Sequence, residues 1–124
     1  MKKVLIIEDN DVQIKVFEKI VNQLDIDCIL ANTGNDGLDK LRDYNDEIGL
    51  VLLDLALPDI SGLDILKKAK AEKIKTPIAI LSATEDSKIA LDAGKLGAVD
   101  FFIKGSNPDD LLRLFEFISQ IIDN

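Results

Sequence analysis

A chain of 124 residues is long enough for one domain with a buried core, and nothing in its composition indicates a second domain. Its formal net charge of −8 at pH 7 repels phosphate backbones and anionic lipid, so we expect no direct binding to nucleic acid or to a membrane. The one cysteine, Cys28, excludes an internal disulfide, and its apolar neighbours predict a buried thiol. With no signal segment and no run of membrane-spanning length, the chain is expected to be cytoplasmic.

The first predicted strand, Lys3 to Ile7, ends abruptly at an acidic loop, Glu8 to Asp11. This loop opens a helix from about residue 12 to residue 24, with Asp11 as its predicted N-cap. Gln13 projects from the middle of the apolar face of this helix. Because a buried amide without partners is costly, we expect its side chain to hold the acidic loop by hydrogen bonds.

The next two strands differ in character. The second, Asp27 to Ala31, is short and leads through a turn into a helix that ends near Asp43. The third contains the unbroken apolar run Leu50 to Leu53, which is typical of a strand buried on both faces of a parallel sheet. This run stops at one carboxylate, Asp54, and the turn residues 58–62 follow. Asp54 therefore lies where ligands bind in parallel sheets.

The remaining elements continue the alternation of strand and helix. A lysine-rich helix carries an apolar stripe, a fourth strand closes at a serine, and a fifth closes at a lysine. The last helix begins with an N-cap, a proline and two acids, which is a strong start signal. In order, these features are Leu63, Ile65, Leu66 and Ala69; Ile78 to Leu81 with Ser82; a helix beginning at Glu85 or Asp86; Asp100 to Ile103 with Lys104; and Asn107 to about Ile122.

Five strands that alternate with five helical patterns predict an α/β fold. Right-handed crossovers place such strands in a doubly wound parallel sheet with helices on both faces. We expect residues 1–124 to form a single domain without an output domain.

Polar residues follow the strand ends at Glu8, Asp9, Asp54, Ser82 and Lys104, and all of them would meet at one sheet edge. Clustered carboxylates repel one another unless a proton or cation intervenes, and an all-oxygen site suits Mg²⁺. A lysine and a hydroxyl could hold phosphoryl oxygens. The constellation therefore predicts phosphoryl transfer to a carboxylate, with Asp54 as the in-line nucleophile.

Taken singly, each of these residues has a plainer interpretation. Asp54 could only cap the following turn, Glu8 and Asp9 could solvate a helix start, and Lys104 could only pair with them. Ser82 could be an ordinary turn serine. The joint pattern favours the functional interpretation.

The segment Asp54 to Gly62 resembles the motif D-x-x-[ML]-P-x-x-[SD]-G, and residues 93–98 resemble the ending of a fourth helix in the same family. The whole chain is similar to a stand-alone, chemotaxis-regulator-like receiver domain of the two-component response-regulator family. This resemblance implies a flavodoxin-like sheet of order 2-1-3-4-5. It also implies Asp54 as the phospho-acceptor, with Lys104 and Ser82 in the reaction.

By the same resemblance, Glu8, Asp9, Asp54 and the carbonyl of Ala56 would bind Mg²⁺, and Ser82 and Phe101 would act as switch residues. Phe101 lacks the hydroxyl of the tyrosine that the family often has there. The family usually has Lys-Pro with a cis bond, whereas this chain has Lys104-Gly105. Since a cis bond to a non-proline costs about 2.5–4 kcal/mol, we expect a trans bond.

The resemblance implies a signalling switch and not an enzyme, apart from self-catalysed transfer and autodephosphorylation. The phosphoryl donor would be a histidine kinase or a histidine phosphotransfer protein, with Mg²⁺ as cofactor. The main alternative is a receiver-like interaction module that is never phosphorylated. A flavin or dinucleotide carrier lacks its glycine-rich loop here, and a dehalogenase-like phosphatase would place its nucleophile after the first strand.

We expect the downstream partner, or a second copy in a homodimer, to bind the fourth helix, fifth strand and fifth helix. The predicted core stripe of the last helix is Leu111, Phe115, Ile118 and Ile122. Phe117 and Leu91 point away from their core stripes, so both are predicted to be exposed and part of this surface.

Overall fold

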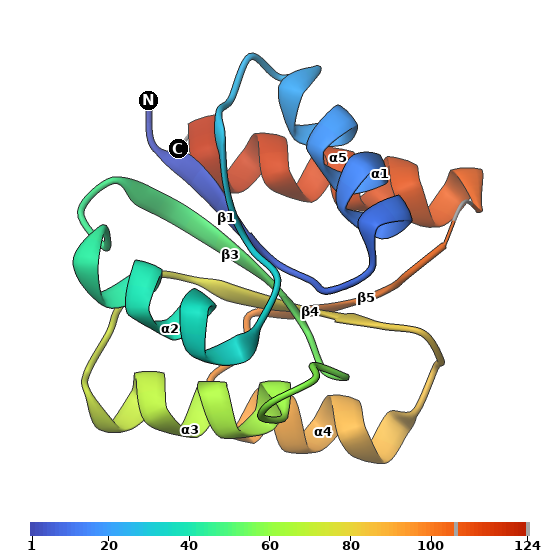
Figure 1. Ribbon diagram of the computed structural model, residues 1–124. Helices are drawn as coiled ribbons and strands as arrows, with labels where there is room; N and C mark the ends of the chain where they lie inside the picture. The colour runs from blue at the N-terminus through green and yellow to red at the C-terminus, as the bar shows by residue number, and fades with distance from the viewer. Residues whose placement is uncertain (106, 124) are drawn as a thin grey trace.

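The computed structural model describes residues 1–105 and 107–123. Its centre is a parallel sheet in the order β2-β1-β3-β4-β5, which confirms the doubly wound fold (Figure 1). The strands are β1 Lys3–Ile7, β2 Cys28–Ala31, β3 Ile48–Asp54, β4 Ile78–Ser82 and β5 Asp100–Ile103.

Helices cover both faces of this sheet, and they divide two against three (Figure 1). Helices α1 and α5 pack on one face, and α2, α3 and α4 pack on the other. None of the described helices is long and apolar enough to cross a membrane. The helices are α1 Asp11–Asn22, α2 Gly34–Asp43, α3 Gly62–Ala71, α4 Ser87–Lys95 and α5 Pro108–Asp123.

The unbroken apolar run of β3 is explained by burial on both faces. Val51 and Leu53 pack into the core beneath α2 and α3, while Leu50 and Leu52 pack into the core beneath α1 and α5. Successive side chains of a strand point to opposite faces, so a strand between two helical layers needs an apolar residue at every position. Asp54 continues this strand and is itself buried.

Helix α1 corrects one prediction about its start. Asn10, and not Asp11, is the N-cap: the backbone of Asn10 is extended, and its side chain accepts a hydrogen bond from the Gln13 N–H at 3.0 Å. Asp11 is already helical and places its charge in the first turn, where it favours the helix dipole. At α4, Asp86 is the N-cap, as one of the two predicted alternatives.

Helix α5 corrects the predicted core stripe. Leu114 and Ile118 are buried, whereas Leu111, Phe115 and Ile122 are only partly buried. Phe117 is half-buried and not exposed, because its ring packs against Phe102 with the centroids 5.0 Å apart. The buried face is centred nearer Leu114 than the predicted stripe, since α5 packs against α1 as well as against the sheet.

The neighbouring helices α3 and α4 differ in how deeply they are held. Helix α3 buries Gly62, Ile65, Leu66 and Ala69. Helix α4, which the structure describes in full, buries only Ala93. Its Leu91 is 60% exposed, which confirms the prediction for that residue.

Cys28 is half-buried on the edge strand β2 and not fully buried as predicted. An edge strand has a neighbour on one side only, which leaves its side chains less covered. Burial, together with the negative charges of Glu18 and Asp27, raises the pKa of the Cys28 thiol to about 12. The thiol therefore stays protonated at neutral pH.

Candidate functional site

The predicted site residues follow the carboxyl ends of β1, β3, β4 and β5. One carboxylate oxygen from each of Glu8, Asp9 and Asp54 can be chosen so that the three lie within 4.8 Å of one another. The Lys104 Nζ lies 3.0 Å from Glu8 Oε1 and 3.2 Å from Asp54 Oδ2. Parallel pairing of the strands brings together residues that are up to 96 positions apart in the sequence.

Glu8 is completely buried, and its carboxylate accepts hydrogen bonds on both oxygens. Oε2 accepts from the N–H groups of Asp9 at 3.0 Å and Asn10 at 3.2 Å, and Oε1 accepts from Lys104. Burial, with a further contribution from the Asp54 carboxyl, raises the pKa of Glu8 to about 7. The bonds from Lys104 and Asn10 oppose this shift. The metal-free site thus holds its excess negative charge at a cost.

Asp54 is 1% exposed and presents its two oxygens differently. Oδ1 accepts a hydrogen bond from the Ala56 N–H at 3.1 Å. Oδ2 lies within ion-pair distance of Lys104, yet it is buried and accepts no hydrogen bond from the described residues. A buried carboxylate oxygen without a hydrogen bond is uncommon, and it marks an atom that is open to a ligand.

The donor set fits Mg²⁺, which prefers carboxylate and carbonyl oxygens and keeps several waters. Glu8, Asp9 and Asp54 supply only oxygen ligands, and Oδ2 of Asp54 is paired with Lys104 but accepts no hydrogen bond from the part of the chain that the structure describes. The Ala56 carbonyl belongs to the loop that Asp54 Oδ1 holds through the Ala56 N–H. Two of the predicted ligands are therefore already linked.

Lys104 is the cation of the site, and 13% of its side chain is exposed. Burial alone would lower the pKa of this lysine, but the hydrogen bond to Glu8 and the charge of Asp54 raise it above its ordinary value. The Lys104-Gly105 bond is trans, as expected, and no cis bond occurs in the described chain. Gly105 has φ +131°, a backbone conformation that suits glycine. With this backbone, the Lys104 side chain reaches the carboxylates of both Glu8 and Asp54.

Ser82 ends β4 and is buried, but its hydroxyl turns away from the acidic cluster in this state. Its Oγ donates to the Thr84 carbonyl at 2.8 Å and accepts from the Thr84 N–H at 3.3 Å. The serine thus closes the turn that leads to α4. A phosphoryl oxygen would have to compete with the Thr84 carbonyl for this hydroxyl.

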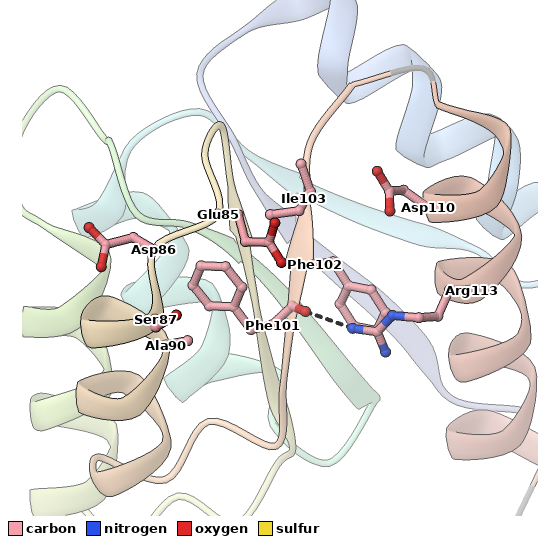
Figure 2. A pocket seen from close by; sticks show the side chains of 9 residues that line it. All are labelled: Glu85, Asp86, Ser87, Ala90, Phe101, Phe102, Ile103, Asp110 and Arg113. Carbon is pink, nitrogen blue, oxygen red and sulfur yellow. Dashed lines mark hydrogen bonds between the residues drawn. The ribbon is translucent and has the colours of Figure 1, made fainter.

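Phe101 lies away from the acidic cluster, on β5 between α4 and α5. It is half-buried and lines a recess of about 250 Å³ in which its ring faces Ser87 and Ala90 of α4 (Figure 2). Arg113 lies on the other side of β5: it donates to the Phe101 carbonyl at 2.7 Å and covers the Phe102 ring at 4.2 Å (Figure 2). The sequence analysis missed Arg113, because a cation–π contact across elements leaves no local pattern.

Gln13 contradicts its prediction. Its side-chain Oε1 is buried but has no hydrogen-bond partner among the described residues, so it does not hold the acidic loop. Two N–H groups of that loop, those of Asp9 and Asn10, donate to Glu8 instead, and Asn10 accepts from the Gln13 backbone. The loop is therefore held by its own side chains.

Residues 4–116 match the family model of the response regulator receiver domain. The chain belongs to this family. Receiver domains accept a phosphoryl group on an aspartate in a Mg²⁺-dependent reaction, and they are signalling domains and not classical enzymes. They take the group from histidine kinases and act on downstream partners.

Among curated relatives, the receiver domain is 36% identical over 114 residues to the cell cycle transcriptional regulator CtrA of Caulobacter vibrioides. It is 33% identical over 112 residues to the cell cycle response regulator CtrA of Brucella ovis. Each match covers 89% of this chain and 47% of the relative. The chain therefore spans about half the length of these relatives.

Solved structures give the same result for the fold. The receiver domain superposes on a structure from the CheX-CheY-BeF3-Mg complex of Borrelia burgdorferi with a TM-score of 0.88 at 20% identity, covering 98% of this chain and 89% of that one. A response regulator receiver protein from Pseudomonas putida matches with a TM-score of 0.83 at 30% identity, covering 96% of each chain. The predicted order 2-1-3-4-5 is thus confirmed as the receiver fold.

Proposed function

We propose that Asp54 is the phospho-acceptor of this receiver domain. The observation that carries the proposal is the Asp54 Oδ2 atom, which is buried, accepts no hydrogen bond from any described residue and lies 3.2 Å from Lys104. A nucleophile must present a lone pair that is not already engaged, and a fixed cation beside it can stabilise the phosphoryl oxygens. Oδ1, held by Ala56, fixes the orientation of the carboxylate.

Glu8, Asp9, Asp54 and the Ala56 carbonyl are the residues that would hold Mg²⁺. The metal, when bound, supplies charge neutralisation for the carboxylates and for the phosphoryl oxygens. Lys104 then leaves its pairing with Glu8 and Asp54 to bind a phosphoryl oxygen, and Ser82 donates its hydroxyl to another. The donor is a phosphohistidine of a kinase or phosphotransfer protein. Asp54 Oδ2 bonds to phosphorus as the phosphorus–nitrogen bond breaks and its electron pair returns to the ring nitrogen, so that the imidazole, which carries a proton on its other nitrogen, leaves as a neutral group. Water attack on the acyl phosphate reverses the signal.

The output surface that we propose consists of α4, β5 and α5. Leu91 is exposed on α4, and Phe101 lines the recess between α4 and α5 (Figure 2). Ser82 connects this surface to the site, because its hydroxyl closes the turn that leads to Asp86, the N-cap of α4. The surface would receive a downstream protein or a second copy of the chain.

Two further features belong to the proposal. The charge of −8 disfavours direct contact between this domain and nucleic acid. A histidine kinase as donor, together with a single unpaired cysteine, supports a cytoplasmic location. Residues 1–124 act as one receiver domain. The alternative, an interaction module without phosphorylation, is disfavoured by the complete set of three carboxylates, a serine and a lysine.

The test is incubation with acetyl phosphate or a phosphoramidate, with and without Mg²⁺, followed by intact mass measurement. Wild type should gain one phosphoryl group only with Mg²⁺. Asp54→Asn should gain none, because an amide is not a nucleophile, and it should melt no lower than wild type in the metal-free state, since one repelling charge is removed. Phosphorylation of Asp54→Asn at the wild-type rate would disprove the assignment.

For the output surface, Leu91→Ser is the informative variant, because the exposed side chain contributes little to the core. It should leave the phosphorylation rate unchanged and weaken self-association or partner binding of the phosphorylated form. Unchanged binding in both states would mean that this surface is inert.

A further inference from the structure

The loop between β3 and α3 is attached to the start of a different helix. Asp59 of this loop accepts two backbone hydrogen bonds from the first turn of α2: Oδ1 accepts from Gly34 at 2.8 Å and Oδ2 accepts from Asn35 at 2.8 Å. The next N–H of α2, that of Asp36, goes to Thr33 Oγ1 at 3.1 Å. The free donors of α2 are thus shared between its own N-cap and a residue 25 positions away.

This attachment is specific in geometry. A helix start offers N–H groups and a positive dipole end, and a carboxylate that accepts from two of them is held in both position and orientation. The N–H of Asn35 is the main cause that lowers the pKa of Asp59, so the carboxylate stays ionised and bound. Space is tight as well, because a Cβ on Gly34 would lie 2.6 Å from Ile60 Cγ1.

Asp59 is one of three anchors of this loop. At the loop's start, the Ala56 N–H is bonded to Asp54 Oδ1. At its end, the Gly62 N–H is bonded to the Leu55 carbonyl at 3.0 Å, and Gly62 sits so close that a Cβ would lie 2.7 Å from the Asp54 carbonyl oxygen. Between these points, Asp59 is the side chain that ties the loop to another element by hydrogen bonds.

We infer that Asp59 is a positioning residue for the Mg²⁺ site. Its hydrogen bonds to the start of α2 hold in place the loop that carries the Ala56 carbonyl. The inference rests on the proposed function, in which that carbonyl binds the metal. Because a carbonyl ligand has no charge, its contribution depends on being in place before the metal arrives. Asp59 provides this preorganisation through its bonds to the N–H groups of α2, without being a ligand of the metal itself.

The experiment measures the Mg²⁺ dissociation constant by calorimetry in wild type, Asp59→Ala and Thr33→Val. Both variants remove a cap of α2, but only the first releases the loop, so Thr33→Val is the matched control. Removal of groups that orient metal ligands typically weakens metal affinity about 10- to 100-fold, and we expect Asp59→Ala at the low end of this range. Thr33→Val should stay within about twofold of wild type, since it leaves the loop attached.

A second readout needs no metal. In the metal-free protein, amide hydrogen exchange at Leu55, Ala56 and Gly62 should accelerate in Asp59→Ala and not in Thr33→Val. Gly34→Ala tests the position of the loop without changing the charge of Asp59. It removes no carboxylate, but its Cβ pushes Ile60 and the loop away, so it should also weaken Mg²⁺ binding. Asp59→Asn keeps one acceptor and should bind Mg²⁺ with intermediate affinity, which provides a measurement if the alanine variant is poorly folded.

The outcomes are distinguishable. Equal weakening in Asp59→Ala and Thr33→Val would overturn the inference, because the stability of α2 would then be the cause. Normal affinity in Gly34→Ala with loss in Asp59→Ala and Asp59→Asn would also overturn it, because long-range charge would suffice. Wild type that binds no Mg²⁺ would instead contradict the proposed function.

Discussion

Helices α3 and α4 pack on the same face of the sheet (Figure 1), but they are held in different ways. Helix α3 buries Ile65, Leu66 and Ala69 in the core, and the Arg42 side chain of α2 binds Glu72 at its end with bonds of 2.7 and 2.6 Å. Helix α4 buries Ala93 alone and offers Leu91 to solvent. The loop that follows Asp54 therefore leads into a firmly packed helix, whereas α4, the helix that follows Ser82, is loosely packed.

This difference indicates the direction in which a signal can travel. Hydrogen bonds hold the loop that follows Asp54, so a phosphoryl group on Asp54, the acceptor proposed above, would lie beside an anchored loop. Ser82 ends β4 and leads to α4, and Lys104 follows β5, the strand that lines the recess beside α4. Regions with few buried apolar contacts open and shift at lower free energy than core elements. A structural change at the site is therefore expected to shift α4 more readily than α3.

The largest expected effect is on stability. Ile65→Ala removes a fully buried side chain of α3 and should lower the free energy of unfolding by about 2–5 kcal/mol. Leu91→Ala in α4 should change it by no more than about 0.5 kcal/mol, as for other exposed positions. Urea unfolding of both variants measures the contrast. Similar losses would mean that α4 is held as firmly as α3.

The second effect concerns Mg²⁺, which we expect to bind at the acceptor loop and not near α4. Metal that binds only the folded state stabilises it by about 2.7 kcal/mol at one hundred times the dissociation constant. The melting temperature of wild type should therefore rise with added Mg²⁺, and that of Asp9→Asn should rise much less. Lys95→Gln in α4 serves as a control with an unchanged shift. Equal shifts in wild type and Asp9→Asn would remove Asp9 from the metal site.

The third effect is a pH dependence that arises from Glu8. Its pKa in the folded protein is about 7 against 4.5 for a free glutamate, so the folded state binds this proton more tightly. The stability that protonation of Glu8 contributes to the folded state is fully present below pH 4.5 and is lost as the pH rises through about 7. In metal-free protein, Glu8→Gln should therefore lose less stability than wild type between pH 5 and pH 8. Parallel curves would show that burial of Glu8 has no such cost.

The smallest effect is local and concerns the dynamics of the two helices. Backbone amides of α4 should exchange hydrogen faster than those of α3 in wild type, because α4 has less buried apolar surface to lose on opening. Phosphorylation or an acyl phosphate mimic should alter exchange in α4 more than in α3. Equal protection of the amides of α3 and α4 against exchange would mean that the two helices do not differ in this way.

The sequence predicted the fold and the site's composition, because both follow from local patterns. An apolar run such as that of β3 requires two helical layers, and parallel strands bring Glu8, Asp54 and Lys104 to one edge whatever their separation. The trans Lys104-Gly105 bond followed from the energy of a cis bond alone. These inferences needed no knowledge of tertiary contacts.

The failures occurred where a side chain chooses among several possible partners. Asn10 and Asp11 are both good N-caps, and the backbone geometry decided between them. The N–H groups of Asp9 and Asn10 donate to Glu8, and the Gln13 side-chain oxygen has no partner among the described residues. From the motif, Asp59 is predicted to be a turn residue. Its bonds to Gly34 and Asn35 depend on how closely its own loop approaches the start of α2 in the folded chain. No periodicity encodes such contacts.

The bond between Glu8 and Lys104 spans 96 positions, and this has a consequence for the order in which the chain is made. Synthesis proceeds from the N-terminus at about 5–20 residues per second, so β1 and β3 emerge well before β5. A nascent chain that ends before Lys104 holds the buried carboxylates of Glu8 and Asp54 without the cation that pairs with them, and an unpaired buried charge opposes compaction. Ribosome-bound chains should therefore remain open at this edge until the fifth strand is released, and divalent metal ions should allow them to close earlier.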